Sequence, residues 1–325
     1  MLYLSKKLTP RPQIRGLVTS LLLTATACAL ALGQQATPAT ATPAAGQSAS
    51  IPRAPAGIRH VFIVSFDGGK PAVMQQSKMP TLLSLKKDGA GTWGAQTILP
   101  SITLVSHTSM LTGVGPSKHH ILWNEWEPEK GLVPVPTVFS VAKKANKNQI
   151  TAMFVGKQKF AHLFLPGSLD AFAMPDYSAR IVAREAAEYI TLRKPGLCFI
   201  HFADSDGAGH AYGWGSPEQV KAFADEDEAL KIVCDGLKRA GIEKDSVVIM
   251  TADHGGHAKT HGSNSPEDMT IPWIAWGTGV KKGYTITAPI TTYDTAATAL
   301  WLLNVPIPSE WDGKPVTSAF ETLSR

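Results

Sequence analysis

The stretch that decides both the fold and the site is Thr251-Ala-Asp-His-Gly-Gly-His-Ala-Lys-Thr-His261. It overlaps a continuous apolar run, residues 246–252, typical of a strand that is covered on both faces. Asp253 and His254 should therefore emerge at the carboxyl end of a strand, where open α/β sheets bind their ligands. Imidazoles and a carboxylate this close together suit zinc or a similar divalent ion. Asp and His beside Gly are also common in turns, so a metal site needs further ligands elsewhere in the chain.

The rest of the chain from residue 58 alternates strand patterns with helix patterns. Strands are predicted at 60–66, 150–155, 197–202, 247–250 and 271–276, with a strand-like run at 98–102. Helices are predicted at 79–87, 103–111, 137–147, 178–192, 217–240 and 293–303. Strands separated by helices of this length pair in parallel, with helices on both faces of the sheet. The sequence therefore predicts an α/β fold, a three-layer α/β/α sandwich with a mostly parallel central sheet.

The first 57 residues have a different composition. Residues 1–33 combine a basic start with an apolar run and a small-residue cleavage site, which predicts a secretory signal peptide. An alternative is a lipoprotein signal, in which Cys28 carries a lipid anchor. Residues 34–57 are rich in Ala, Thr and Pro and predict a disordered linker, so the folded domain is expected over 58–325. We expect an exported protein, periplasmic or secreted.

Net charge and cysteine content narrow the class of partner. Removing the signal peptide lowers the formal net charge from +5 to about +1, so the sequence gives no basis for specific nucleic-acid binding. Two cysteines remain in the expected domain, Cys198 and Cys234. Their positions fit either a disulfide or two buried free thiols.

A second group of candidate ligands follows the predicted strand 197–202. Asp206 and His210 are four residues apart across two glycines, and a loop there could fold both side chains onto one ion. With His261 they make one carboxylate and two imidazoles, which leaves an open position as in catalytic zinc sites. Asp67 follows the strand 60–66 and could join the Asp253 and His254 pair at a second ion. Two neighbouring ions can clamp the attacking and leaving oxygens of a phosphoryl group.

Thr103 is the candidate nucleophile. It opens a predicted helix, where unpaired backbone N–H groups favour an anion, and a metal ion beside it would activate its hydroxyl. In isolation, however, Thr103 also fits a helix N-cap.

Four segments occur in an order that matches a known superfamily. They are Phe62-Ile-Val-Ser-Phe-Asp-Gly68, residues 103–113, Asp206-Gly-Ala-Gly-His210, and Ala252-Asp-His-Gly255 followed by His261. In these segments the chain resembles the alkaline phosphatase superfamily, and within it the type I phosphodiesterase and nucleotide pyrophosphatase branch. The resemblance covers about residues 60–320.

The resemblance implies a hydrolase of phosphate esters, foremost a phosphodiesterase or nucleotide pyrophosphatase, that forms a phosphothreonine at a two-zinc site. Thr103 would be the nucleophile, and the amide of Asn124 would bind a phosphate oxygen. The implied ligands are Asp206, His210 and His261 for the first metal, and Asp67, Thr103, Asp253 and His254 for the second. Iron or manganese would also fit these ligands. The substrate is expected to be a small-molecule phosphate ester.

The chain departs from the branch at two places. His120 stands where the family has Gly, within His119-His-Ile-Leu-Trp-Asn124, and Val105-Ser106 stands where the branch usually has Pro-Asn. Both changes concern the shape of loops near the nucleophile. Lys157 and Lys159 match a Lys-x-Lys pair that binds the substrate carboxylate in the related phosphonoacetate hydrolases, although a solvated loop explains them equally well.

Other functions remain open on this scaffold. The chain could be a phosphomonoesterase or a phosphonate hydrolase, or a metal-binding envelope protein without catalytic activity. Sulfatases of the same fold need a Cys-x-Pro-x-Arg motif, which surrounds neither Cys198 nor Cys234.

Overall fold

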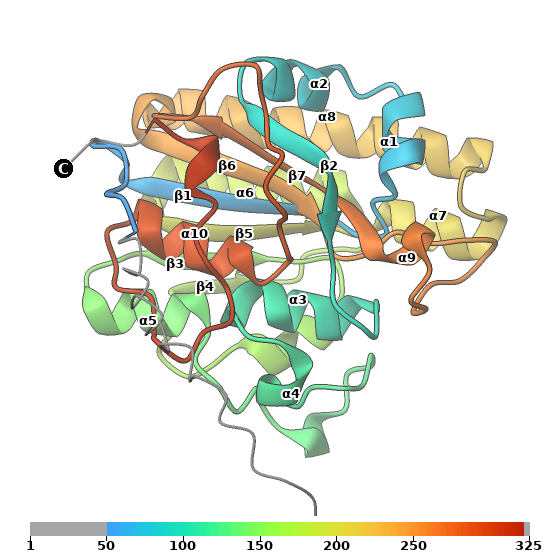
Figure 1. Cartoon of the computed structure of the whole chain (residues 1–325), viewed down its shortest axis with the longest axis horizontal. Helices are drawn as coiled ribbons and strands as arrows, with labels where there is room; N and C mark the ends of the chain where they lie inside the picture. The colour runs from blue at the N-terminus through green and yellow to red at the C-terminus, as the bar shows by residue number, and fades with distance from the viewer. Residues whose placement is uncertain (1–50, 322–325) are drawn as a thin grey trace, which may run out of the picture. The chain divides into compact units, whose positions relative to one another are not determined.

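An eight-stranded sheet lies at the centre of residues 51–321, the part of the chain that this computed structural model describes (Figure 1). The strands are β1 (His60–Phe66), β2 (Ala90–Gln96), β3 (Thr151–Phe154), β4 (Ala171–Ala173), β5 (Leu197–Phe202), β6 (Ser246–Ala252), β7 (Thr270–Gly277) and β8 (Tyr284–Thr285). Their order is β4-β3-β5-β1-β6-β7-β2-β8. Only β7 runs antiparallel to its two neighbours, so the prediction of a mostly parallel sheet is confirmed.

Helices cover both faces of the sheet. The helices are α1 (Pro71–Gln76), α2 (Pro80–Lys87), α3 (Thr103–Thr112), α4 (Pro116–His119), α5 (Val138–Ala145), α6 (Ala179–Arg193), α7 (Asp204–Tyr212), α8 (Pro217–Ala240), α9 (Pro266–Met269) and α10 (Asp294–Leu302). Successive side chains of a strand point to opposite faces. In β1, Val61 and Ile63 pack with α3, α5 and α10, whereas Phe62 and Val64 pack with α1, α2, α6 and α8. The predicted three-layer sandwich is confirmed (Figure 1).

The three central strands place the candidate residues together. β5, β1 and β6 are adjacent and parallel, with Phe66 at the end of β1 opposite both Phe202 and Ala252. Asp67 and Asp253 follow these strand ends directly, and α7 begins two residues beyond β5. The carboxyl ends of parallel strands share one edge of the sheet, so segments far apart in sequence meet there.

Several elements differ from the sequence-based prediction. α7 is a helix where a loop was predicted, and residues 98–102 form no strand. Two glycines in α7 hide its helical character, because glycine lowers helix propensity. The helix is favoured instead by Asp204 and Asp206 in its first turn, and by Ser205 N–H, which donates to buried Glu226 at 3.0 Å.

The amino-terminal boundary of the domain also moves. Residues 51–57, expected as the end of a disordered linker, pack on the domain: Ala54 is 6% exposed, and Trp301 Nε1 donates to Pro52 O at 2.7 Å. The expectation of disorder is wrong for residues 51–57, because they make apolar and hydrogen-bonding contacts with the folded domain. The expected signal peptide (1–33), its alternative lipid anchor at Cys28 and linker residues 34–50 lie outside the described residues. Within 51–321, no helix is both long and apolar enough to cross a membrane.

Cys198 and Cys234 are both free and buried, so of the two alternatives the thiols apply. Burial raises the pKa of the Cys198 thiol. A buried thiol with a raised pKa is inert, so these cysteines play no part in the chemistry of the site.

Buried His119 is expected to make stability depend on pH. Its Nδ1 accepts from Ile121 N–H at 3.0 Å, so its Nε2–H donates to Ser109 Oγ. Burial and the charge of His120 lower the pKa of His119 to about 4. The unfolded state therefore binds more protons between that pKa and the ordinary one near 6.5. The contribution of neutral His119 to the free energy of unfolding is complete above about pH 6.5, and roughly 3 kcal/mol of it is lost as pH falls to 4.

Urea unfolding in EDTA between pH 7 and pH 4 tests this expectation. The His119→Gln variant is the control, because it removes only this titration. The free energy of unfolding should fall about 3 kcal/mol further in the parent chain than in the variant. Parallel pH curves for the two proteins would contradict the assignment.

Candidate active site

The deep part of the candidate site contains three ligand atoms at nearly equal spacing. Thr103 Oγ1 lies 3.5 Å from Asp67 Oδ1 and 3.4 Å from His254 Nε2, and the last two atoms are 3.5 Å apart. Ligands around a tetrahedral zinc ion are separated by roughly 3.3 Å, given bonds of about 2.0–2.1 Å. All three side chains are buried. The arrangement therefore has the dimensions of a metal site.

Thr103 is not a helix N-cap. Ile102 occupies the N-cap position of α3, without a side-chain capping bond, and Thr103 is the first helical residue. Its hydroxyl points to the candidate metal ligands instead. The N-cap alternative for this residue is therefore wrong.

Asn124 is held against the start of α3. Its Oδ1 accepts from Leu104 N–H at 2.9 Å, which leaves the amide nitrogen as a donor beside Thr103. The turn before it contains His120 at φ 57°, in the left-handed region, which costs roughly 1–2 kcal/mol for a residue with a Cβ. The Gly-to-His departure thus keeps the turn at an energetic cost, and Asn124 stays in place.

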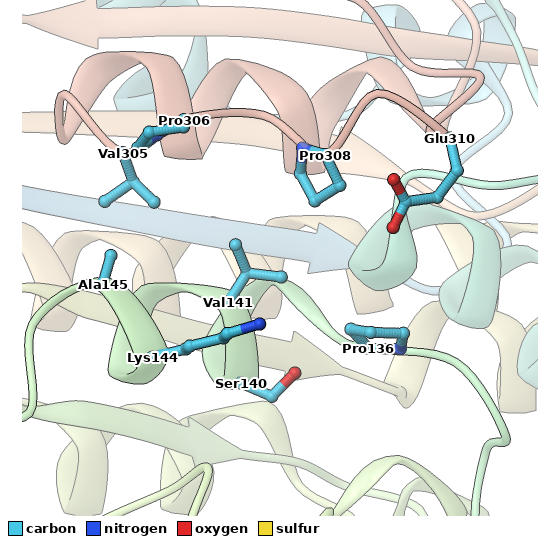
Figure 2. A pocket seen from close by; sticks show the side chains of 9 residues that line it. All are labelled: Pro136, Ser140, Val141, Lys144, Ala145, Val305, Pro306, Pro308 and Glu310. Atoms are coloured by element: carbon cyan, nitrogen blue, oxygen red, sulfur yellow. The ribbon is translucent and has the colours of Figure 1, made fainter.

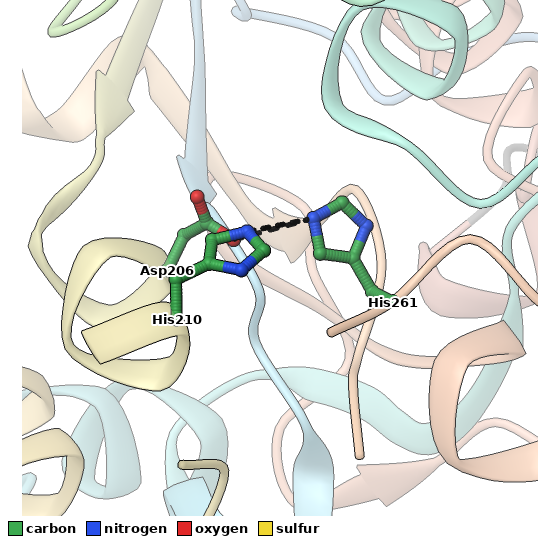
Figure 3. Close-up of side chains that lie close together, drawn as sticks. All are labelled: Asp206, His210 and His261. Carbon is green, nitrogen blue, oxygen red and sulfur yellow. Dashed lines mark hydrogen bonds and ion pairs between the residues drawn. The ribbon is translucent and has the colours of Figure 1, made fainter. Parts of the chain in front are cut away.

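The outer part of the site is formed by Asp206, His210 and His261 (Figure 3). Asp206 and His210 share one face of α7 because they are four residues apart on a helix. Asp206 Oδ1 lies 3.4 Å from His210 Nε2 and 3.6 Å from His261 Nε2, and the two imidazole nitrogens are 3.1 Å apart. Three potential ligand atoms therefore converge on one point.

The tautomers of these histidines are set by backbone carbonyls. The Nδ1–H of His210 donates to Lys259 O at 3.0 Å, and that of His261 donates to Ser101 O at 2.9 Å. His254 uses its Nδ1–H in the same way, donating to Gly255 O at 2.8 Å. Each Nε2 lone pair therefore faces the site, as in metal-binding histidines. Lone pairs this close are stable only around a cation or a proton.

Two buried carboxylate oxygens of the candidate site lack a hydrogen-bond partner among the described residues. Asp206 Oδ1 and Asp253 Oδ2 accept no hydrogen bond, although buried polar atoms nearly always do. Asp253 Oδ2 lies 3.2 Å from His254 Nε2. One such oxygen stands in each part of the site, and Asp67, Asp206 and His254 offer atoms within 4.8 Å of one another. The donor set fits two adjoining divalent ions.

Burial and local charge set the protonation states. Burial and the neighbouring His261 lower the pKa of His254 to about 4, so the His254 imidazole is neutral in the physiological range. Burial and the Asp67 charge raise the pKa of Asp253. Burial raises the pKa of Asp67 as well, but Lys157 and His201 outweigh this effect and hold the pKa below its usual range. Two carboxylates of the same site thus differ in how well their charge is compensated.

Lys157 and Lys159, the predicted substrate-binding pair, have different surroundings. Lys157 Nζ lies 2.6 Å from both Asp67 Oδ2 and Asp206 Oδ2. Lys159 Nζ lies 3.9 Å from Glu125, its nearest acidic partner in the described part of the chain. Burial and the Lys157 charge lower the pKa of Lys159. Substrate binding by either lysine stays a prediction, but only Lys159 lacks a close internal partner.

Two supporting residues could not be found from the sequence. His201 donates from Nε2 to Asp67 Oδ2 at 2.8 Å, and Asp268 accepts from His257 Nδ1 at 2.7 Å and from Ser263. His257 is therefore a support of the 253–261 segment and lies outside both groups of ligand atoms. Neither His201 nor Asp268 belongs to a motif that would have marked it in advance.

Trp214 connects the segments that carry the ligands. Its Nε1–H donates to Gly68 O at 3.1 Å, and its ring makes edge contacts with His210 and His261 at centroid distances of 5.2 and 5.8 Å. Its indole also leaves no room at Gly209 or Gly256, where an added Cβ would lie 2.9 and 2.2 Å from the ring. One side chain thus packs against three of the four segments that carry candidate ligands, those of Asp67, of α7 and of residues 253–261.

The Trp214→Ala variant is therefore expected to bind zinc about tenfold more weakly at the outer site, as is usual when a group that supports a ligand is lost. It should also lose roughly 3 kcal/mol of stability, because a large side chain is truncated. Isothermal titration with zinc and urea unfolding measure the two effects. Trp214→Phe keeps most of the packing, so its zinc affinity and stability should lie between those of the parent chain and those of Trp214→Ala. Unchanged zinc affinity in Trp214→Ala would contradict the role.

A separate groove lies away from these residues. A cavity of about 570 Å³ opens between α5 and the segment after α10, and Figure 2 shows its lining side chains. The lining is Pro136, Ser140, Val141, Lys144, Ala145, Val305, Pro306, Pro308 and Glu310. It contains none of the candidate ligands or Thr103, so the groove has no part in the proposed chemistry.

Comparison with protein families decides the classification. The profile described as "Type I phosphodiesterase / nucleotide pyrophosphatase" matches residues 61–263, more than half of the chain. The chain belongs to this family. The match includes every residue of both candidate metal groups as well as Thr103 and Asn124.

Curated relatives of the phosphodiesterase family are more distant. The chain is 27% identical over 235 residues to human "Ectonucleotide pyrophosphatase/phosphodiesterase family member 1", which covers 64% of this chain and 25% of that protein. It is 26% identical over 215 residues to an uncharacterised pyrophosphatase/phosphodiesterase of Schizosaccharomyces pombe, covering 60% of this chain and 44% of the relative. The chain thus spans less than half the length of these relatives.

Solved structures share the fold. Murine ectonucleotide pyrophosphatase/phosphodiesterase 5 in complex with AMP aligns with a TM-score of 0.70 at 15% identity, covering 81% of this chain and all of that one. A 2-O GAG sulfatase aligns with a TM-score of 0.65 at 16% identity, covering 81% and 74%. The predicted alkaline phosphatase-like fold is therefore confirmed. The fold alone does not separate phosphodiesterases from sulfatases.

Proposed function

We propose that this member of the phosphodiesterase family is a hydrolase of phosphodiester and pyrophosphate bonds that uses two divalent ions, foremost zinc, and forms a phosphothreonine on Thr103. The observation that carries the proposal is the placement of Thr103. Its hydroxyl lies 3.5 Å from Asp67 and 3.4 Å from His254, at the start of α3 and beside Asn124. The candidate nucleophile therefore lies beside candidate metal ligands and beside an amide that can donate a hydrogen bond to a phosphate oxygen.

The side chains have distinct parts in the reaction. Divalent ions bound there would lower the pKa of the hydroxyl and neutralise phosphate charge. The Thr103 hydroxyl releases its proton to solvent and Oγ attacks phosphorus in line, so the Oγ–P bond forms while the bond to the leaving oxygen breaks. Asn124 Nδ2 and the start of α3 stabilise the phosphate oxygens. Water then attacks the phosphothreonine and restores the hydroxyl, while solvent supplies the proton that the leaving oxygen takes up.

Substrate comparison on zinc-loaded protein tests the proposal. The substrates are bis-p-nitrophenyl phosphate, the p-nitrophenyl ester of thymidine 5′-monophosphate and p-nitrophenyl phosphate. We expect kcat/KM for the two diesters to exceed that for the monoester by at least about tenfold, a difference of roughly 1.4 kcal/mol in transition-state binding. A preference for the monoester would contradict the diester assignment while leaving the site intact.

A second function is favoured by Lys159. Its side chain is only 12% exposed, and no acidic group of the described chain lies closer than 3.9 Å. A substrate with a second anionic group near phosphorus, such as a phosphonoacetate-like compound, would give this cation a partner. The alternative is therefore a phosphonate hydrolase or a phosphomonoesterase. The phosphonate hydrolase would be favoured if the chain released inorganic phosphate from phosphonoacetate faster than it hydrolysed the diesters.

A protein without catalytic activity is the remaining alternative. It would bind zinc but hydrolyse none of these substrates, so metal content and turnover together distinguish it. We also infer from the expected signal peptide that the protein acts outside the cytoplasm. Cell fractionation of the full chain tests this inference, since a cytoplasmic pool of uncleaved protein would contradict it.

A further inference from the structure

Lys157 contacts both parts of the candidate metal site. It follows β3, which pairs with β5, and its Nζ lies 2.6 Å from Asp67 Oδ2 and 2.6 Å from Asp206 Oδ2. The side chain is only 11% exposed, so solvent screens these contacts weakly. One ammonium therefore bridges a carboxylate from each site.

The ammonium and the candidate metal positions use different oxygens. Asp67 turns Oδ2 to Lys157, whereas its Oδ1 lies 3.5 Å from Thr103 Oγ1 and from His254 Nε2. Asp206 likewise turns Oδ2 to Lys157, and its Oδ1 faces His210 and His261 at 3.4 and 3.6 Å. Lys157 thus leaves one oxygen of each carboxylate directed at a metal position.

The charges explain why a cation is needed there. Asp67, Asp206 and Asp253 are buried within one site. Burying a carboxylate without a partner costs far more than burying a paired one. Asp67 and Asp206 share the Lys157 ammonium, while among the described residues Asp253 Oδ1 accepts only from Gly68 N–H at 3.1 Å.

We propose that Lys157 is a positioning residue that fixes one carboxylate ligand of each metal site and does not bind substrate. The inference rests on the two-metal site of the proposed function and deepens it. It divides the Lys-x-Lys pair between two roles. Lys157 orients Asp67 and Asp206, whereas Lys159, close to Glu125 and without a closer partner, remains for a substrate anion.

Zinc affinity measured against a chromophoric chelator tests the proposal without using activity. Lys157→Met should weaken both zinc equivalents together by about tenfold, the usual effect of removing a group that orients a metal ligand. Lys159→Met is the matched control, with the same substitution two residues away, and should keep both affinities within about twofold. Lys157→Arg keeps the charge and should restore most of the affinity.

The opposite outcomes are equally informative. Unchanged zinc affinity in Lys157→Met would show that the ammonium does not orient the ligands, and tighter zinc binding would show that it competes with the ions. Weaker zinc binding at one site alone would contradict the bridging role. At saturating zinc, KM for bis-p-nitrophenyl phosphate should stay within about twofold in this variant; a larger rise with zinc intact would make Lys157 a substrate ligand.

Two further controls separate the possible failures. If Lys157→Met does not fold by circular dichroism, Lys157→Gln is measured by the same criteria, because it can still donate to one carboxylate. If the parent chain binds no zinc, the proposed function fails. If it binds two equivalents that Lys157→Met leaves unchanged, only the present inference fails.

Discussion

The Thr103→Ala variant should lose at least about a thousandfold in kcat on bis-p-nitrophenyl phosphate, because the oxygen that attacks phosphorus is removed. Zinc should remain bound. Thr103 supplies one of four candidate ligands in its site, and Asp67, Asp253 and His254 stay in place. The fold should also survive, because the hydroxyl caps no helix and fills little space. The expected result is therefore an inactive protein with full metal content.

Thr103→Ser is the matched control for this prediction. It keeps a hydroxyl at the same Cβ, so kcat should stay within about tenfold of the parent chain. Metal content by mass spectrometry and the thermal midpoint should be alike in both variants. If Thr103→Ala kept most of its activity with zinc bound, a water molecule would be the attacking group and the phosphothreonine would be excluded.

The sequence predicted the parts of the fold whose patterns are continuous. Strands such as β1 and β5 are apolar runs buried on both faces, and the long helix α8 is flanked by Ser216 at its N-cap and Gly241 at its C-cap. Every predicted helix, and every predicted strand except the run at 98–102, lies within two residues of its observed bounds. β2 was missed because its glycines and polar residues break the apolar pattern, and its pairing with β7 is irregular.

The candidate ligands were predictable because they follow strand ends. Asp67 and Asp253 come directly after β1 and β6, and parallel strands bring such residues to one edge. The prediction that Asp67 and Asp253 lie close to Thr103 and His254 rests more on the resemblance to the family motifs than on the periodicity of strands and helices. Their roles in metal binding and catalysis stay proposals, supported by the convergence of unpaired oxygens and imidazole lone pairs.

The bridging of Asp67 and Asp206 by Lys157 could not be predicted from the sequence. It depends on the order of three strands, because β3 lies beside β5 and β5 beside β1, and sequence patterns do not specify that order. The helical form of α7 was hidden for a similar reason. One of its glycines, Gly209, makes room for Trp214, a contact that exists only in the folded chain.

The sulfatase neighbours share the fold of this chain, so only the residues of the site can indicate its chemistry. One of them aligns with this chain at a TM-score of 0.65, yet the cysteines of the described chain lie buried in β5 and α8, away from the carboxyl ends of the strands. The residue at the start of α3 is a threonine without a capping role. The fold therefore does not assign a chemistry to this chain, and the role of Thr103 as the nucleophile stays a proposal.

Asp253→Asn should change stability and function in opposite directions. The Asp253 carboxylate is buried, its Oδ2 has no hydrogen-bond partner in the described structure, and burial and the Asp67 charge raise its pKa. An amide removes this charge and can still accept from Gly68 N–H through Oδ1. In EDTA the variant should therefore gain about 1–3 kcal/mol of stability, a rise in the thermal midpoint of roughly 5 °C.

The same change should abolish function, because a neutral amide is a much poorer zinc ligand than a carboxylate. We expect the stabilisation by zinc to shrink to that of the outer site alone, and kcat to fall at least about a hundredfold. Calorimetry with EDTA and with zinc measures both effects on one sample. Asp268→Asn is the control, since Asp268 already has hydrogen-bond partners and its substitution should destabilise the protein in either condition. A lower midpoint for Asp253→Asn in EDTA would mean that the charge is compensated within the protein itself, and the case for a cation at this position would lose its main support.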